Sequence, residues 1–171
     1  MDPTLRRAAR ILLVDGSDRL LMFHGFDPAR PAHHYWFTAG GGLAPGEPAA
    51  AGAARELAEE TGLRMTADQL GDPVWDEVTE YPFDGRWYRQ RQEFFLVRVS
   101  AWEVSTDGFN QVERGSIDGH RWWTIEELET TTERFYPEDL PALLRRLLRG
   151  AAPSGVAASG AGPVAGGGTP C

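Results

Sequence analysis

One short helix constrains this chain more than any other segment, because it sets three carboxylates on one side. Residues 48–61 predict the helix, since a proline suits its first turn and Gly62 suits the left-handed position after its last. Glu56, Glu59 and Glu60 stand at i, i+3 and i+4, where neighbouring Cβ atoms are about 5–6 Å apart. The acidic face is expected opposite an apolar stripe of small residues that packs on a sheet.

Three like charges so placed repel one another, and a cation held between them removes the repulsion. Immediately upstream, three consecutive glycines at residues 40–42 let bare backbone approach the same place. Carboxylates and backbone oxygens suit a hard divalent cation, above all Mg²⁺, which also binds substrate phosphates. The segment therefore predicts a magnesium site.

The order of elements predicts a single mixed α/β domain over residues 1–149. A chain of 171 residues, 42% hydrophobic and 11% aromatic, is long enough to bury an ordinary core. Strands are expected at residues 8–14, 19–24, 36–38, 74–81, 87–99 and 120–123, and further helices at 124–128 and 137–149. Thr124 and Glu127 form a capping-box pattern at the start of the first of these two helices. Residues 26–34 read as a loop, and the uncharged segment 150–171, rich in Gly and Ala, predicts a disordered tail.

Charge and cysteine content narrow the partners and the compartment. The net charge of −8 argues against a stable nucleic-acid complex and against an anionic membrane surface, but a bound Mg²⁺ would still admit a small phosphorylated substrate. No run approaches the roughly 20 apolar residues of a membrane span, and the N-terminal ILLV run is too short for a signal sequence. The one cysteine, Cys171, excludes an internal disulfide, so a cytoplasmic location is expected.

The acidic helix and its glycines resemble the Nudix box, with the pattern G-x5-E-x7-R-E-U-x-E-E-x-G-U, where U is aliphatic. Every fixed position from Gly41 to Leu63 matches, including Glu47 and Arg55. The resemblance implies the Nudix fold, a mixed sheet sandwiched between helices (α/β/α). It also implies a Mg²⁺-dependent pyrophosphohydrolase, with Mn²⁺ as an alternative ion, that cleaves a phosphoanhydride in a nucleoside diphosphate linked to a further group X.

The resemblance also implies roles for the residues of the box. Glu59 and Glu60 would be the main metal ligands, Glu56 a third ligand or a base, and the Gly40 carbonyl a backbone ligand. Arg55 would orient the neighbouring carboxylates by ion pairing. The remaining positions, Gly41, Glu47 and Gly62, would be structural, with Glu47 capping or supporting the start of the helix.

A further carboxylate outside the box is expected, because family members often use an additional metal-ligand or base Glu. Glu93 is the first candidate, since a charged residue beside a buried strand core is unusual. An ion pair of an edge strand with Arg89 or Arg91 is the alternative. Glu113 and Glu77 are weaker candidates for the same role.

Substrate contacts are harder to assign. Arg10, Arg89 and Arg91 can bind phosphate, although surface ion pairs explain each of them as well. In some subfamilies a Tyr or a Pro after the box distinguishes enzymes for dinucleoside polyphosphates from those for ADP-ribose. Here Tyr81 and Pro82 are adjacent, so this cue does not decide between the two substrates. Aromatic candidates for stacking on a base, each also a candidate for core packing, are Trp36, Phe83, Tyr88 and Trp122.

The histidines are interpreted without a catalytic role. His33 and His34 are adjacent, so on a strand they would face opposite ways, and they are read as a solvated loop pair; His120 is read as structural. ADP-ribose-like compounds, dinucleoside polyphosphates and (d)NTPs all stay open as substrates. The alternative function is a non-catalytic Nudix module that senses a ligand or binds a protein, and the resemblance makes a homodimer a candidate assembly.

Overall fold

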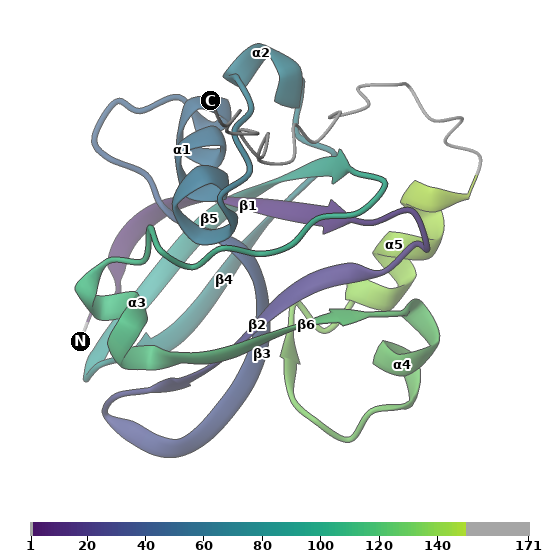
Figure 1. Ribbon diagram of the computed structural model, residues 1–171. Helices are drawn as coiled ribbons and strands as arrows, with labels where there is room; N and C mark the ends of the chain where they lie inside the picture. Colours follow the sequence, from purple (N-terminus) through teal and green to yellow (C-terminus); the bar gives the residue numbers. More distant parts are fainter. Residues whose placement is uncertain (1, 150–171) are drawn as a thin grey trace, which may run out of the picture.

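The computed structural model describes residues 2–149, which form a seven-stranded mixed sheet with helices on both faces (Figure 1). The strands are β1 (Thr4–Val14), β2 (Leu20–Asp27), β3 (Arg30–Gly42), β4 (Trp75–Phe83), β5 (Arg86–Arg98), β6 (Ile117–Trp123) and β7 (Phe135–Tyr136). The helices are α1 (Ala49–Thr61), α2 (Ala67–Leu70), α3 (Gln111–Ser116), α4 (Ile125–Thr130) and α5 (Leu140–Leu148). The expected α/β/α architecture is confirmed.

The first strand lies in the middle of the sheet, whose order is β4-β5-β1-β2-β3-β7, with β6 beside β2. β1 runs parallel to β5 along its whole length. On its other side it pairs with the end of β3 at residues 8–11 and with β2 only at Val14. The glycines at the end of β3, residues 40–42, are therefore held directly against β1 as part of the sheet.

Alternation along β1 divides the interior into two cores. Ile11 and Leu13 face α1 and α2, whereas Leu12 and Val14 face α4 and α5, and all four are fully buried. This alternation explains why the ILLV run is continuously apolar, since a central strand is covered on both faces.

Helix α1 packs its small residues on the sheet, as the sequence predicts. Ala53 and Leu57 are fully buried, and Gly62 ends the helix with φ 78°, its N–H donating to the Ala58 carbonyl at 3.0 Å. The expectation that the carboxylates lie opposite this stripe is wrong, because Glu56 and Glu60 are buried beside it. The acidic side of α1 thus runs from the buried Glu56 and Glu60 to the partly exposed Glu59.

Several elements differ from the predicted ones. The predicted loop at residues 26–34 is mostly strand, since β2 and β3 extend to a tight turn between Asp27 and Arg30. Helix α5 begins at Leu140 and not at residue 137, and α2, α3 and β7 were not expected. The capping box of Thr124 and Glu127 at α4 is present as predicted. The predicted tail, residues 150–171, lies outside the described residues.

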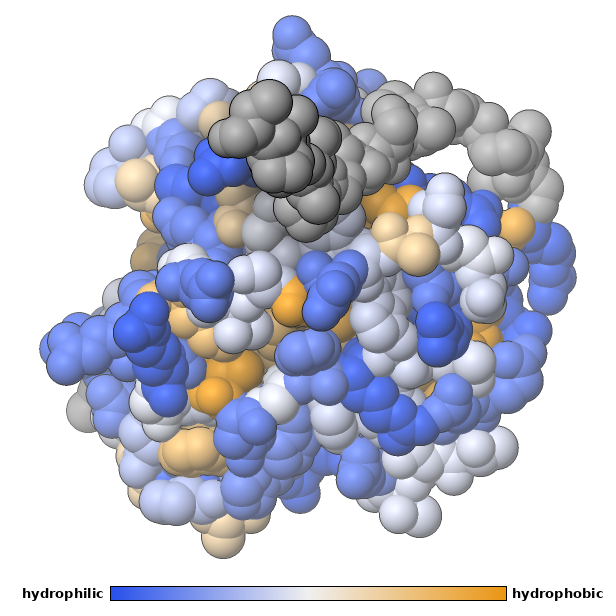
Figure 2. Space-filling model, viewed as in Figure 1, coloured by the Kyte–Doolittle hydropathy of each residue, from blue (hydrophilic) through white to orange (hydrophobic). Residues whose placement is uncertain are grey.

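Hydrophilic residues dominate the face in Figure 2, which also shows an apolar patch close to α3. None of the helices between residues 2 and 149 has the length and apolar character that crossing a membrane requires.

Candidate active site

The last residues of β3, Gly40 to Gly42, bring strand backbone close to α1. Glycine is required at Gly40, and at Gly41 it leaves room for a carboxylate. Gly40 has φ 123°, and a Cβ there would lie 2.1 Å from the Ala9 carbonyl oxygen. A Cβ on Gly41 would lie 2.8 Å from Oε1 of Glu56. The absence of side chains at these positions lets the Glu56 carboxylate sit against the strand.

Glu60 is the most deeply buried carboxylate of the site. Only 2% of the residue is exposed, and its Oε2 accepts the Gly40 N–H at 2.7 Å. Burial, followed by the charge of Glu56, raises the pKa of Glu60 well above its ordinary value, although the Gly40 hydrogen bond opposes the shift. A positive charge at this point would relieve the cost of keeping the group ionised.

Glu56 and Glu59 continue the acidic face toward solvent. Glu56 is 6% exposed, while 39% of the Glu59 side chain is exposed. Burial raises the pKa of Glu56, the ion pair with Arg55 opposes the shift, and the charge of Glu59 adds to it. These carboxylates therefore offer oxygens that are partly desolvated and open on one side.

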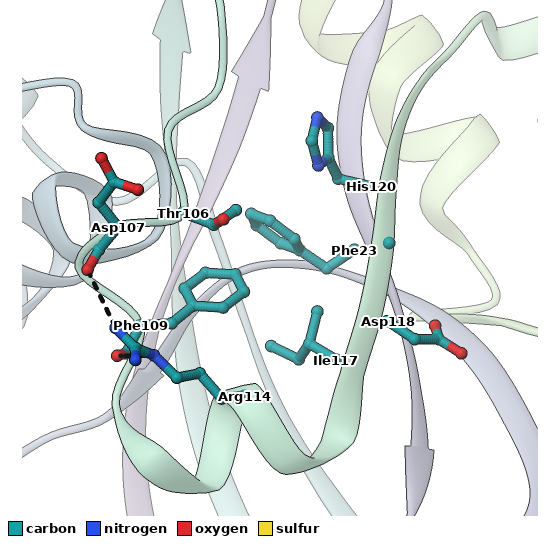
Figure 3. A pocket seen from close by; sticks show the side chains of 9 residues that line it. Phe23, Thr106, Asp107, Phe109, Arg114, Ile117, Asp118 and His120 are labelled. Atoms are coloured by element: carbon teal, nitrogen blue, oxygen red, sulfur yellow. Dashed lines mark hydrogen bonds between the residues drawn. The ribbon is translucent and has the colours of Figure 1, made fainter.

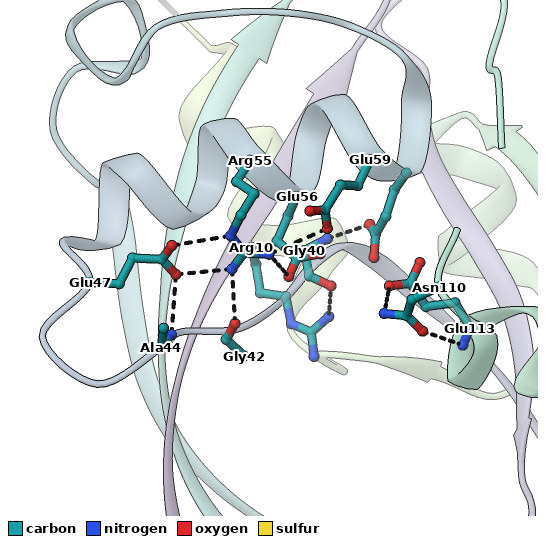
Figure 4. A network of polar contacts seen from close by, with 11 residues as sticks. Arg10, Gly40, Gly42, Ala44, Glu47, Arg55, Glu56, Glu59, Asn110 and Glu113 are labelled. Atoms are coloured by element: carbon teal, nitrogen blue, oxygen red, sulfur yellow. Dashed lines mark hydrogen bonds and ion pairs between the residues drawn. The ribbon is translucent and has the colours of Figure 1, made fainter. Parts of the chain in front are cut away.

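Arg55 ties the helix to the loop before it (Figure 4). Its Nη1 donates to Glu56 at 3.0 Å and to Glu59 at 3.3 Å, and its Nη2 donates to the Gly42 carbonyl at 3.2 Å. The same guanidinium holds both oxygens of Glu47, at 2.9 and 3.1 Å. Arg55 thus orients the carboxylates, as the family resemblance implies.

Glu47 supports the helix in a way that differs from the expected cap. The N-cap residue is Pro48, with no side-chain cap hydrogen bond, while Glu47 accepts the Ala44 N–H at 3.2 Å and pairs with Arg55. The hydrogen bonds from Arg55 hold the pKa of Glu47 below its ordinary value. Glu47 therefore fixes Arg55 and closes the loop, and the capping role is corrected.

A fourth carboxylate, Glu113, comes from α3 (Figure 4). One oxygen each from Glu113, Glu56 and Glu59 lie within 4.8 Å of one another. Oε1 of Glu113 accepts the Asn110 side-chain N–H at 2.5 Å, while its Oε2 is buried without a hydrogen-bond partner among residues 2–149. Burial, then the charges of Glu56 and Glu59, raise the pKa of Glu113 to about 6.

The arrangement fits a hard divalent cation such as Mg²⁺. All donors are oxygens, Arg55 alone provides a cation within hydrogen-bond distance of the carboxylates of α1, and Glu113 has a buried oxygen still unpaired within the described part of the chain. The Gly40 carbonyl accepts from Nη1 of Arg10 at 3.0 Å and keeps a second lone pair. The expected ligand set is thus brought together, with Glu113 added.

Glu93, the first candidate for a carboxylate outside the box, does not join this group. It is half-buried in β5, in register with Ala9 on one side and Asp76 on the other. The alternative edge-strand ion pair is wrong, because β5 lies between β4 and β1, and Arg89 and Arg91 pair with other residues. The sequence predicted the strand that carries Glu93 but not the helix that carries Glu113. It therefore gave no reason to prefer Glu113 over Glu93 as the additional carboxylate.

Arg10, Tyr81 and Glu77 belong to a chain of polar contacts around two buried glutamines of β5. Nε of Arg10 donates to Gln92 at 3.2 Å, and Gln92 donates to Glu77 at 2.5 Å. The hydroxyl of Tyr81 donates to Gln90 at 2.7 Å. Arg10 thereby links these glutamines to the Gly40 carbonyl of the acidic site.

Arg89 and Arg91 are exposed and form weak ion pairs across the β4–β5 hairpin. Arg89 lies 3.7 Å from Glu80, and Arg91 lies 3.5 Å from Asp76. Both line a hollow of about 560 Å³ that also reaches the loop before α1. The surface ion pairs expected for Arg89 and Arg91 are therefore present. Their role as phosphate contacts stays a prediction.

A second hollow, of about 580 Å³, opens beside α3 (Figure 3). The rings of Phe23 and Phe109 meet edge to face in it, with centroids 5.7 Å apart. Arg114 and His120 lie at its border, and Arg114 follows Glu113 directly in the chain. Helix α3 therefore contributes Glu113, a weaker candidate from the sequence, to the acidic cluster and Arg114 to the aromatic hollow. The hollow was not predicted because α3 was not expected.

Comparison with known proteins agrees with this geometry. The model of the NUDIX domain matches residues 4–145. The chain is similar to an RNA pyrophosphohydrolase of Bradyrhizobium diazoefficiens, 32% identical over 104 residues, which span 56% of this chain but only 62% of that protein. It is also similar to an RNA pyrophosphohydrolase of Dinoroseobacter shibae, 30% identical over 71% of this chain and 76% of the relative.

Among solved structures, the MutT protein of Methanosarcina mazei Go1 superposes with a TM-score of 0.63 at 19% identity, covering 87% of this chain and 96% of that one. At this identity the likeness concerns the fold alone. Together with the complete box and the match over residues 4–145, it leads to one conclusion: the chain belongs to the NUDIX domain family.

Proposed function

We propose that this protein is a divalent-metal-dependent pyrophosphohydrolase that cleaves a phosphoanhydride bond of a nucleotide. One observation carries the proposal: three glutamates of α1 and one of α3 converge beside the glycines of β3, and within residues 2–149 only Arg55 forms ion pairs with them. A cluster so rich in unneutralised carboxylates is costly to bury without a cation. The names of the two relatives, both RNA pyrophosphohydrolases, support the same reaction class.

Glu56, Glu59 and Glu60 are the proposed ligands of Mg²⁺ or Mn²⁺, with Glu113 as a further ligand and the Gly40 carbonyl as the backbone ligand. When bound, such an ion neutralises phosphate charge and makes a bound water more acidic. The chain itself supplies the orientation: the Gly40 N–H fixes Glu60, and Arg55 fixes Glu56 and Glu59.

In the proposed reaction a water oxygen forms a bond to phosphorus, and the bridging P–O bond breaks toward the leaving phosphate. The water proton passes to a carboxylate acting as general base. Glu56 is one candidate because it lies within the cluster, and Glu93 is the other because it is half-buried on β5, between β4 and β1. Unchanged turnover in Glu93→Gln would leave Glu56 as the base.

The substrate class is a nucleotide carrying a 5′-polyphosphate or diphosphate link. The candidate substrates are ADP-ribose-like compounds, dinucleoside polyphosphates and (d)NTPs. The triphosphate end of an RNA is a fourth candidate, which the names of both relatives suggest. The half-buried ring of Phe109, which packs edge to face on the buried Phe23, is suited to hold a base, with Arg114 near a phosphate. Arg10, Arg89, Arg91 and Tyr81 remain proposed substrate contacts. We place the activity in the cytoplasm, in a single domain of residues 1–149.

The test is product analysis by mass spectrometry across a panel of all four compound classes with Mg²⁺ or Mn²⁺. Turnover of one class that disappears in Glu59→Gln and survives in the exposed control Glu103→Gln is the expected result. Size-exclusion chromatography of the same samples distinguishes a monomer from the expected homodimer. Folded protein that binds a nucleotide without hydrolysing any would favour a ligand-sensing module and overturn the proposal.

A further inference from the structure

A second cluster of donor side chains lies on the sheet, away from the acidic site. His24 on β2, His34 on β3 and Asp118 on β6 each offer one ligand atom, and the three atoms lie within 4.8 Å of one another. His24 alternates along β2 with Phe23, which belongs to the core under α1, so it faces the side that carries α4 and α5. The two clusters therefore lie on opposite faces of the sheet.

Strand pairing explains how three distant segments meet here. His24 pairs with Trp36, so His34, two residues earlier on β3, points to the same face as His24. On the other side His24 pairs with Gly119 and Gly25 pairs with Ile117, which leaves Asp118 as the extra residue of a β-bulge. In a regular ladder Asp118 would pair with Gly25 and point to the opposite face.

The bulge thus re-aims a carboxylate toward two imidazoles. Nδ1 of His24 lies 2.5 Å from Oδ1 of Asp118, and the rings of His24 and His34 are parallel with centroids 5.3 Å apart. The His24–Asp118 contact is satisfied without an ion. The His34 ring, however, forms no hydrogen bond within residues 2–149, although it is held beside the pair.

The separations suit a small tetrahedral ion after minor side-chain movement. Two donors each about 2.05 Å from such an ion are about 3.3 Å apart, which lies between the shortest separation of 2.5 Å and the upper limit of 4.8 Å found here. Asp118 and His34 are exposed and 26% of the His24 side chain is exposed, so these side chains can adjust. An exposed site also leaves a fourth position for water.

We propose that His24, His34 and Asp118 form a second metal site, selective for a borderline transition metal such as Zn²⁺. Two imidazole nitrogens and one carboxylate oxygen are typical Zn²⁺ ligands, whereas the all-oxygen cluster of α1 and α3 suits Mg²⁺. The ion would join β2, β3 and β6 at the bulge. Phe23 and Ile117, which line the aromatic hollow, come from two of these strands.

The site is tested by Zn²⁺ titration of the metal-stripped full chain carrying Cys171→Ser, which removes the one thiol. Excess Mg²⁺ occupies the glutamate cluster during calorimetry. We expect one Zn²⁺ per chain, with affinity at least tenfold weaker in His34→Ala and in Asp118→Asn. His33→Ala is the matched control, because His33 contacts Arg134 and stands outside the cluster, and its affinity should be unchanged.

Imidazole ¹⁵N NMR provides a second measurement that does not depend on folding of any variant. Zn²⁺ should shift the ring signals of His24 and His34 and leave those of His33 and His120 in place. The proposal is overturned if Zn²⁺ binding survives both His34→Ala and Asp118→Asn, or if Glu59→Gln abolishes it. Ring signals of His24 and His34 that do not move with saturating Zn²⁺ would overturn it equally.

Discussion

Replacing Glu113 by Gln should stabilise the protein when no metal is bound. The carboxyl group has a pKa of about 6, against an ordinary value of 4.5, because it is partly buried and faces Glu56 and Glu59. A raised pKa means that the folded state binds the proton more tightly than the unfolded state. The stability contributed by protonation is complete below pH 4.5 and is lost as the pH rises through about 6.

The magnitude follows from that difference. A rise from 4.5 to about 6 corresponds to about 2 kcal/mol at pH 8, and screening of this partly exposed group reduces it to about 1 kcal/mol. Gln keeps the shape of Glu and an oxygen for the Asn110 side chain, which now donates to Oε1. Its amide N–H₂ can also replace the unpaired Oε2 and donate to the neighbouring carboxylates.

Thermal unfolding in EDTA at pH 4 and pH 8 measures the effect. For a chain of this size, about 1 kcal/mol should raise the Tm of Glu113→Gln by about 2–4 °C at pH 8 and leave it nearly unchanged at pH 4. Glu103→Gln, on an exposed residue, is the control and should change neither value. A variant that is equally or less stable than the parent at pH 8 in EDTA would refute the account of repulsion within the cluster. With saturating Mg²⁺ the order should reverse, since the variant loses a ligand.

Three further changes probe other parts of the molecule. Gly41→Ala places a Cβ 2.8 Å from Oε1 of Glu56, so calorimetry should show Mn²⁺ affinity reduced at least tenfold, while circular dichroism shows an intact fold. Thr124→Ala removes the side-chain oxygen that accepts the Glu127 N–H, and urea unfolding should show a loss of about 1 kcal/mol. In Asp27→Asn, the charged group that accepts from Asp84, Arg30 and Ala29 is lost, so stability should fall by roughly 2 kcal/mol at pH 7. Burial alone would raise the pKa of Asp27, but those hydrogen bonds lower it below its ordinary value of 3.8. The difference in stability between Asp27→Asn and the parent protein should therefore shrink as the pH falls below 3.8.

The parts of the site that are local in sequence could be predicted. The box specifies helix α1, its left-handed end at Gly62 and the contacts of Arg55 with Glu56 and Glu59, which lie within about one turn of it. Local spacing also predicts the Thr124 capping box. These features depend on dihedral preferences and on neighbours along one helix, which a single sequence contains.

The parts that depend on long-range pairing could not be predicted. Glu113 joins Glu56 from 57 positions away, through a short helix with little periodicity of its own. The edge-strand alternative for Glu93 was open from the sequence because the partner of β5 on its far side is the first strand of the chain. Glu56 and Glu60 are buried because α1 packs against the glycines at the end of β3. The position of those glycines depends on strand pairing in the sheet and not on the sequence of the helix.

The central position of β1 has a consequence for synthesis of the protein. Each residue of β1 pairs with one that lies 84 positions later in β5. At about 5–20 residues per second, a ribosome needs about 4–17 s to make that partner after β1 itself. During this interval β1 can pair only with β2 and β3, and of the helices only α1 and α2 have been made, so a nascent chain halted before residue 86 leaves the β5-facing edge of β1 unpaired. Until β5 emerges, that edge can pair with a strand of another chain, so arrested chains of this length are expected to aggregate more readily than the complete domain.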